Sequence, residues 1–430
     1  MRTSESSLPR SAEPSSWNSI IGWIVLFLSS GAFLGFVAPE GDSQSGSGNL
    51  VMQIVWAGLY LIVFLCLNAD RNLFSIFLQF KLLAAALLLI LVSAFWSVDP
   101  GATIRHGVAV VGSTISGMFL ALKFSRLALL RLVKSALTTT AVLSLGMVLI
   151  LPRVAIMSGS DVDGAWRGVF AHKNGLGHMM LLLILVSYVQ RKSDATRGLS
   201  YIVTAGLALF LLLMSDSKSS VVLLVIVAGI VPFTRFLRRP RWLMPVLVTF
   251  SVAALLMVLA IVNLDKILDL LGRDVTLSRR IPLWIMVVLS IMQRPWLGFG
   301  YGAFWENNNE LFDAITRGAG WTASHAHNGF LQITLDVGLV GLVLALALLF
   351  QMVRQAIKEM RTSPSVTALF PFLFACVFFL CNLDETMILV YNSMFWVLFV
   401  AVLVSTKGQG DLRGDPVRTA VSVRPAESPA

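Results

Sequence analysis

Residues 329–350 read GFLQITLDVGLVGLVLALALLF, an apolar run with one charged side chain, Asp336. A helix of about 20 mainly apolar residues is long enough to cross the hydrocarbon core of a bilayer. The whole chain has the same character: of its 430 residues, 57% are hydrophobic and 13% are charged, and the mean hydropathy is +0.81. Soluble globular proteins contain about 45–50% apolar residues. The sequence therefore predicts an integral membrane protein.

Similar apolar runs recur along the chain and predict an all-α, polytopic fold with about twelve transmembrane helices. They are expected near 17–38, 50–68, 73–96, 104–122, 127–151, 174–190, 199–214, 219–237, 243–263, 329–350, 365–382 and 386–405. The first run lacks a small-residue cleavage site, so we expect a retained span and not a signal peptide. Gln79 and Lys81 interrupt the third run, whose first turns could lie in the membrane interface.

These runs predict one transmembrane domain over residues 17–405, which includes a large loop at 264–328. The tails at 1–16 and 406–430 are polar and contain Ser and Pro, so we expect both to be disordered. The three cysteines, Cys66, Cys376 and Cys381, lie in or beside apolar stretches. They are typical of small buried hydrophobic residues and predict neither a disulfide framework nor a metal site.

The distribution of basic residues predicts the orientation of the chain. With both termini in the cytoplasm, 22 of the 33 Lys and Arg residues fall on the inner side, as the positive-inside rule expects. Nine of the other eleven fall in two segments, 152–173 and 264–328. We therefore expect these two loops to lie on the same, outer side and to share a function that needs positive charge.

Three polar clusters stand beside the spans: 166–174 (WRGVFAHKN), 278–284 (SRRIPLW) and 325–328 (HAHN). Charged side chains next to a membrane are costly and often act on an anion or a proton. Arginine forms bidentate contacts with phosphate, so Arg167, Arg280 and Arg279 are candidates to hold a diphosphate. Anchoring to lipid headgroups is the alternative for these arginines. Lys173 and Asn174 begin a helix, where the dipole also favours an anion.

Histidine is scarce, and four of the five residues lie in or beside these clusters. Near neutral pH an imidazole can take a proton from a hydroxyl, so His325 and His327 are candidates for a general base. His172 and His178 fit a structural role better. A weaker alternative pairs His325 and His327 with Asp161 and Asp163 as metal ligands; the latter two residues fit a turn equally well.

The loop at 264–328 carries its own helical pattern, from Leu283 to Met292, followed by a glycine- and aromatic-rich segment at 294–302. Glycines allow a close approach of backbone to a ligand, and aromatic faces can stack on sugar rings. An amphipathic helix and turn resting on the membrane surface explains the same pattern.

Taken together and in this order, the motifs resemble the O-antigen ligase and O-unit polymerase superfamily, most closely its exopolysaccharide-polymerase branch. The likeness rests on WRGVFAHKN at 166–174, Arg280-x-x-x-Trp284, HAHNGFL at 325–331 and GLVG at 338–341, with FWSVDP at 95–100. The resemblance implies a bacterial inner-membrane glycosyltransferase with a helical, GT-C-like fold and a periplasmic loop over the active site. Such enzymes transfer a glycan from undecaprenyl diphosphate to an acceptor hydroxyl, without metal or cofactor.

Carried onto this chain, the resemblance assigns His327 as the base or acceptor-orienting group and Arg280 and Arg167 as the residues that stabilise the departing diphosphate. Further substrate-binding candidates are Lys173, Asn174, Arg279, His325, Asn328 and Trp284. Arg279 stands where the family often has a smaller residue, which leaves the choice between Arg279 and Arg280 open.

The acceptor is not decided by the sequence. A polymerase uses another lipid-linked repeat unit, a ligase uses lipid A core, and a protein oligosaccharyltransferase uses a Ser or Thr hydroxyl. Chain-length regulators and export proteins are possible partners, besides membrane lipid; nucleic acid is not expected. A transporter or flippase would need charges at mid-membrane and often broken half-repeats. This chain instead gathers its charges at one edge, which favours the enzyme.

Overall fold

A computed structural model describes residues 15–33, 50–68, 77, 79–158, 163–237, 280–306, 311–313, 315 and 323–406. Within these ranges the regular structure is helical, apart from one antiparallel bridge between Ile156 and Trp166. The predicted all-α fold is therefore confirmed. The predicted ninth span at 243–263 and most of both tails lie outside the described residues.

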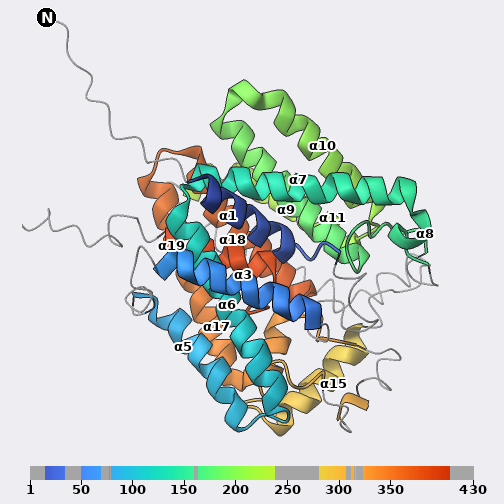
Figure 1. Cartoon of the computed structure of the whole chain (residues 1–430), viewed down its shortest axis with the longest axis vertical. Helices are drawn as coiled ribbons and strands as arrows, with labels where there is room; N and C mark the ends of the chain where they lie inside the picture. The colour runs from blue at the N-terminus through green and yellow to red at the C-terminus, as the bar shows by residue number, and fades with distance from the viewer. Residues whose placement is uncertain are drawn as a thin grey trace, which may run out of the picture.

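Eleven of the twelve predicted runs coincide with a described helix (Figure 1). These are α1 (Ser16–Ser29), α3 (Leu50–Asn68), α5 (Lys81–Val92), α6 (Pro100–Lys123), α7 (Arg126–Ile150), α9 (Lys173–Ser193), α10 (Gly198–Met214), α11 (Lys218–Ile230), α17 (Gly329–Thr362), α18 (Leu369–Asp384) and α19 (Met394–Ser405). The other described α-helices are α8 (Pro152–Ala155), α12 (Thr234–Leu237) and α15 (Arg280–Gln293). Helix α15 matches the helix expected in the loop.

Six described helical runs are long and apolar enough to cross a membrane. They are Leu50–Leu67, Pro100–Lys123, Arg126–Ile150, Lys218–Leu237, Gly329–Thr362 and Val366–Asp384. Other apolar helices, such as α1 and α10, are shorter. Only 22% of the apolar stretch Leu50–Leu67 in α3 is buried. Large apolar side chains such as Leu50, Ile54 and Leu61 lie exposed on this helix. An exposed apolar face of this kind suits a lipid environment, so the chain is a membrane protein, while the count of twelve spans stays a prediction.

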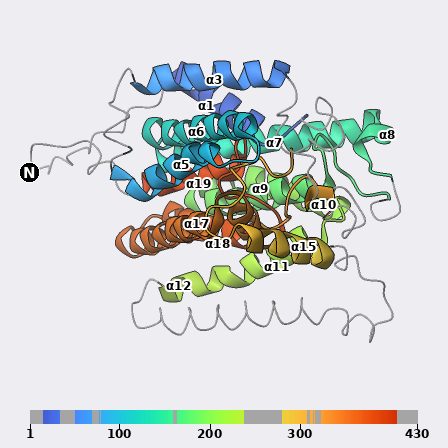
Figure 2. The same cartoon turned by 90° about the horizontal axis from the view of Figure 1, so that it is seen from below.

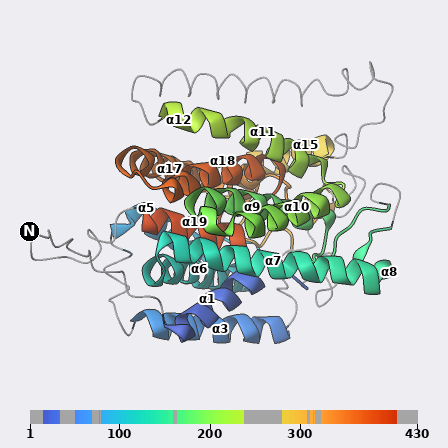
Figure 3. The ribbon, with the colours of Figure 1, turned by 90° about the horizontal axis from the view of Figure 1, so that it is seen from above.

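Helix α19 forms the centre of the bundle. Every residue from Met394 to Val404 is buried, which is typical of a helix that is apolar on all sides. It packs against α6, where a side chain at Gly117 would collide with the carbonyl of Val397. The helices stack in layers in Figures 2 and 3, from α3, through α6 and α7, α19 and α9, and α17 and α18, to α11 and α12.

Helix α19 also corrects one predicted boundary. The span expected at 386–405 becomes helical only at Met394, and residues 385–393 form an irregular connection after α18. The amide side chain of Asn382 fixes this connection by accepting hydrogen bonds from the backbone N–H groups of Met387 (3.1 Å) and Ile388 (2.9 Å). The connection starts with Glu385, whose position matters below.

Helix α17 is interrupted at Val337 and Gly338, where the glycine has a φ of +69°. The segment 294–302 docks into this interruption: the N–H of Phe299 donates to the carbonyl of Leu335 at 3.0 Å, and the N–H of Leu339 to Pro295 at 2.8 Å. A side chain at Gly338 would collide with the backbone of Trp296. Gly298 and Gly338 therefore serve backbone-to-backbone packing, while Gly300 and Gly302 pack against the side chains of Ser97 and His106. This packing gives no support to the sugar platform considered from the sequence.

Candidate active site

The carboxylate of Glu385 is the meeting point of three distant segments. It lies at the end of α18 and is only 5% exposed. Its Oε2 accepts from Nε2 of His325 at 2.9 Å and lies 3.1 Å from Nδ1 of His327. Its Oε1 accepts from Nδ2 of Asn174 at 3.0 Å and lies 3.4 Å from an NH2 of Arg280. The three polar clusters of the sequence thus converge on one buried acid.

The two histidines are held by the start of α17. Asn328 caps this helix, because its side-chain oxygen accepts from the N–H groups of Phe330 (3.0 Å) and Leu331 (3.1 Å). Trp284 of α15 donates its indole N–H to the carbonyl of Ala326, between the histidines, at 3.0 Å. Asn328 and Trp284 therefore shape the histidine turn, and their contact with substrate stays a prediction.

The backbone at His327 adopts an unusual conformation. Its φ is +46°, in the left-handed region that residues with a side chain rarely enter. Strain of this kind persists where the surrounding structure fixes it, and it occurs often at functional sites. The rings of His325 and His327 lie 3.8 Å apart, so the turn presents both imidazoles to Glu385.

The charge states of the buried groups follow from this packing. The pKa of His325 is lowered to about 4, chiefly by burial and then by the neighbouring His327, while Glu385 opposes the shift. Burial would by itself raise the pKa of Glu385, but the charge of His327 and the hydrogen bonds of both histidines outweigh it and hold this pKa well below its usual range. Near neutral pH, Glu385 is therefore a carboxylate and His325 is neutral.

Arg280 begins α15 and reaches across to the end of α18. It pairs with the side chain of Asp384 and donates to the Asp384 carbonyl at 2.7 Å. The same Asp384 carboxylate lies 3.7 Å from Nε2 of His178. Arg280 is thus fixed by two acidic neighbours. The neighbouring candidate, Arg279, lies outside the described residues.

Lys173 and Asn174 form the first turn of α9, and His172 caps it by accepting from the N–H of Asn174 at 3.3 Å. Lys173 pairs with the exposed Asp216 at 3.3 Å. The amide oxygen of Asn174 accepts from the hydroxyl of Ser217 at 3.1 Å. The turn between α10 and α11 therefore aligns the start of α9 with Glu385.

Arg167 lies in the loop before α9 and binds backbone carbonyls. Its Nε donates to Val154 at 2.8 Å and one NH1 donates to Ala171 at 3.3 Å. These contacts brace the loop that leads into His172. The predicted contact of Arg167 with a diphosphate stays a prediction.

His325, His327 and Glu385 could together hold a metal ion, because their ligand atoms all lie within 4.8 Å of one another. This differs from the metal alternative expected from the sequence, which required Asp161 and Asp163. Asp161 lies outside the described residues, and Asp163 is exposed. Two imidazoles and one carboxylate form a plausible ligand set for a divalent transition metal. Metal binding is therefore a competing function for the two histidines, and it has to be tested.

The sequence reasoning missed Asp384 and Glu385. They are the only charged residues between Arg361 and Lys407, within 45 otherwise uncharged positions. An ionisable pair in such an apolar setting is by itself a signal of function. Asp384 and Glu385 belong to none of the three polar clusters, although the arginines and histidines of those clusters each need an acidic partner.

Comparison with known proteins agrees with the motifs. Residues 203–346 match the family model described as O-Antigen ligase. This stretch, about a third of the chain, is similar to the O-antigen ligase family. It is 25% identical over 389 residues to the exopolysaccharide production protein ExoQ of Rhizobium meliloti, covering 85% of this chain and 83% of that protein.

Two shorter similarities concern putative polysaccharide ligases. The protein of Rickettsia conorii is 29% identical over 158 residues, which cover 35% of this chain and 38% of the relative. The protein of Rickettsia felis is 28% identical over 166 residues, which cover 36% and 40%. The family resemblance seen in the motifs is thus confirmed.

Proposed function

We propose that this protein is a bacterial inner-membrane glycosyltransferase that moves a glycan from undecaprenyl diphosphate to an acceptor hydroxyl. Its most favoured reaction is the polymerisation of exopolysaccharide or O-antigen repeat units. The observation that carries the proposal is the convergence of His327, Arg280 and Asn174 on the buried Glu385. A base beside fixed cations is the arrangement that glycosyl transfer from a diphosphate needs.

In the proposed reaction, His327 takes the proton of the acceptor hydroxyl while that oxygen attacks the anomeric carbon of the donor sugar. The bond from the anomeric carbon to the diphosphate oxygen breaks, and its electron pair leaves with the diphosphate. Glu385 orients His327 and stabilises the imidazolium that forms, as a carboxylate does for a catalytic histidine in other enzymes. Glu385 is therefore a positioning residue in this mechanism.

Arg280 and Lys173 are the cations proposed for the diphosphate. Both are paired with carboxylates in the structure, Arg280 with Asp384 and Lys173 with the exposed Asp216. A guanidinium offers five N–H donors, so Arg280 can bind Asp384 and phosphate oxygens together. Arg167 is proposed to contribute from the neighbouring loop, and Arg279 remains a second candidate next to Arg280.

Among the possible reactions, the relatives favour polymerisation, in which the acceptor is another lipid-linked repeat unit. The protein named for exopolysaccharide production matches most of this chain, whereas the putative ligases match about a third of it. Ligation to lipid A core, or transfer to protein, is the alternative reaction at the same site. Transport of a lipid-linked solute is a distant alternative.

The deciding experiment incubates the purified full chain with an undecaprenyl-diphosphate-linked repeat unit and no other acceptor. A ladder of longer glycans, absent in the His327→Ala variant, is the expected result. Product only after addition of lipid A core would establish a ligase instead. A chelator tests the competing metal set: activity lost with chelator and restored by a divalent cation would replace the base with a metal centre.

The proposal places the site on the periplasmic side, with both termini in the cytoplasm. In a variant without Cys66, Cys376 and Cys381, a cysteine at exposed Trp296 should react with an impermeant reagent from the periplasm, and one at exposed Lys192 should not. The reverse labelling pattern would overturn the orientation.

A further inference from the structure

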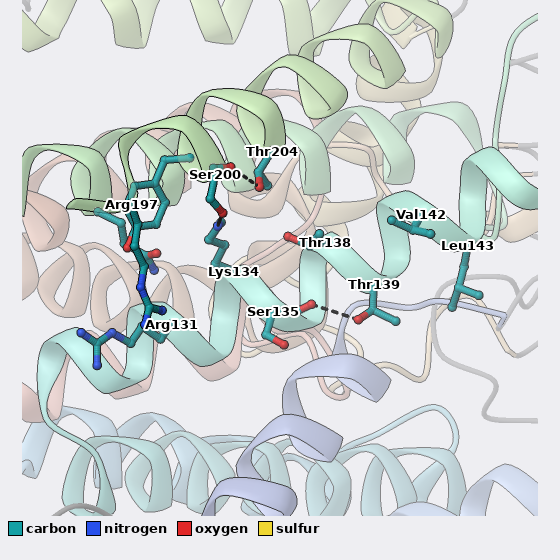
Figure 4. Close-up of a pocket in the computed structure, with 12 residues that line it drawn as sticks. Arg131, Lys134, Ser135, Thr138, Thr139, Val142, Leu143, Arg197, Ser200 and Thr204 are labelled. Carbon is teal, nitrogen blue, oxygen red and sulfur yellow. Dashed lines mark hydrogen bonds between the residues drawn. The ribbon is translucent and has the colours of Figure 1, made fainter. Parts of the chain in front are cut away.

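A second polar region lies between α7, the end of α9 and α10. It is a cavity of about 550 Å³, lined by twelve described residues and shown in Figure 4. They are Arg131, Lys134, Ser135, Thr138, Thr139, Val142, Leu143, Gln190, Arg197, Ser200, Tyr201 and Thr204. Three of them are cations and six carry hydroxyl groups, while none of the twelve is acidic. The lining therefore favours an anion with several oxygen atoms.

Two buried polar side chains at the cavity favour a polar ligand. The side chain of Gln190 is 1% exposed, and neither its Nε2 nor its Oε1 has a hydrogen-bond partner within the described part of the chain. The buried hydroxyl oxygen of Thr138, across the cavity on α7, also has no hydrogen-bond partner within the described part of the chain. A buried polar group without a partner costs about 1–3 kcal/mol, so both groups favour a polar occupant of this cavity.

Lys134, one of the three cations at the cavity, contacts neutral groups. Nζ of Lys134 donates to the hydroxyl of Ser200 at 3.3 Å and lies 4.5 Å from the centre of the Tyr201 ring. Figure 4 shows Lys134 extending from α7 towards Ser200 on α10. The neighbouring acid Asp194 accepts from the N–H of Thr196 at 3.1 Å. Asp194 also interacts with the charges of Arg197 and Arg131, so three cations face one carboxylate and a net positive charge remains for an anion.

The surroundings of the cavity are apolar. Val142 and Leu143, in the lining, are 55% and 36% exposed, and Ile202 and Val203 of α10 are 46% and 63% exposed. Exposed apolar side chains on membrane helices face acyl chains, and basic pockets between such helices bind anionic headgroups. We propose that this cavity binds the phosphate headgroup of an anionic membrane phospholipid, with the acyl chains along α7 and α10.

This lipid site is separate from the Glu385 site. Gln190 lies 16 residues beyond Asn174 on the same helix, α9, which corresponds to roughly 24 Å at about 1.5 Å per residue. The two sites thus lie near opposite ends of α9, and the lipid site does not depend on the proposed transfer reaction.

The test measures lipid binding to the purified full chain in neutral detergent by native mass spectrometry. Cardiolipin and phosphatidylglycerol should bind, and phosphatidylcholine should bind much more weakly. The double variant Arg131→Gln/Arg197→Gln should weaken binding about 25-fold, because each basic residue near the headgroup is worth roughly fivefold. The matched control is Arg191→Gln/Lys192→Gln, two exposed cations in the last turn of α9, which should bind as the wild type does.

A second variant, Gln190→Leu, distinguishes a loss of lipid binding from a folding defect. It should weaken binding of the anionic lipid while leaving the melting temperature of the lipid-free protein equal or higher, because a buried polar group without a partner is removed. Equal lipid binding in the cavity variants and the control would overturn the site. Stabilisation by inorganic phosphate as strong as that by phosphatidylglycerol would overturn the lipid as its occupant.

Discussion

The Glu385 site and the cavity between α7 and α10 use similar side chains in opposite ways. At Glu385 the cations have acidic partners: Arg280 pairs with Asp384, and Lys173 with Asp216. At the cavity, Lys134 contacts a hydroxyl and an aromatic ring. Ion pairs hold charged groups in fixed positions, which suits the stabilisation of a transition state. Three cations beside a single acid, Asp194, leave a net positive charge at the cavity, which favours binding of an anion and requires little orientation.

The largest effect is expected from the histidine turn. His327→Ala should reduce turnover by about 10²- to 10⁴-fold, the usual contribution of a general base. Donor binding should change little, since a base acts mainly in the transition state. His325→Ala is the matched control on the same turn and should lose much less, because His325 is buried and neutral beside Glu385. Turnover assays with a separate donor-binding measurement check this, and equal losses in both variants would refute the assignment.

The two arginines should behave differently. Arg280→Ala is expected to lower turnover about 10²-fold, and Arg280→Lys to restore little, because lysine cannot reproduce the bidentate contact. Arg167 donates to loop carbonyls, so Arg167→Ala should lower the melting temperature together with the activity. Thermal unfolding measured beside turnover distinguishes the two. Full activity of both alanine variants at normal expression would favour headgroup anchoring.

The sequence predicted the helices well, because long apolar runs leave few alternatives in a bilayer. It also brought together the clusters that meet at the site. It did not predict Glu385, since the contact joins residues 174, 280, 325 and 385 through tertiary packing that no local pattern records. Nor did it predict that Asn328 and Trp284 act on the histidine turn. A polar residue beside a motif can serve the helix cap as well as the substrate.

A smaller effect is expected at the carboxylate itself. Glu385→Gln keeps the shape of the side chain but removes the charge beside His327, so turnover should fall by at most the roughly 10²- to 10⁴-fold that the base itself contributes. The loss should fall on kcat and leave KM for the donor little changed, because the carboxylate stabilises the imidazolium that forms in the transition state. Glu385→Asp keeps the charge and should retain more of kcat than Glu385→Gln. A purely structural role would instead lower the activity of both variants together with their melting temperatures.

The smallest effect concerns stability against pH. His325 has a pKa of about 4 in the folded protein, whereas a free histidine titrates near 6.5. Between these values the unfolded chain binds the proton and the folded chain does not, so stability falls as the pH drops from about 6.5 towards 4. Glu385, whose pKa is held low, loses its stabilising contribution only at more acidic pH, below about 4.5. The melting temperature of the wild type should therefore fall between about pH 7.5 and 5, and that of His325→Gln should fall less. Identical slopes would show that the environment of His325 does not disfavour its protonated form, and would place the acid sensitivity of the fold elsewhere.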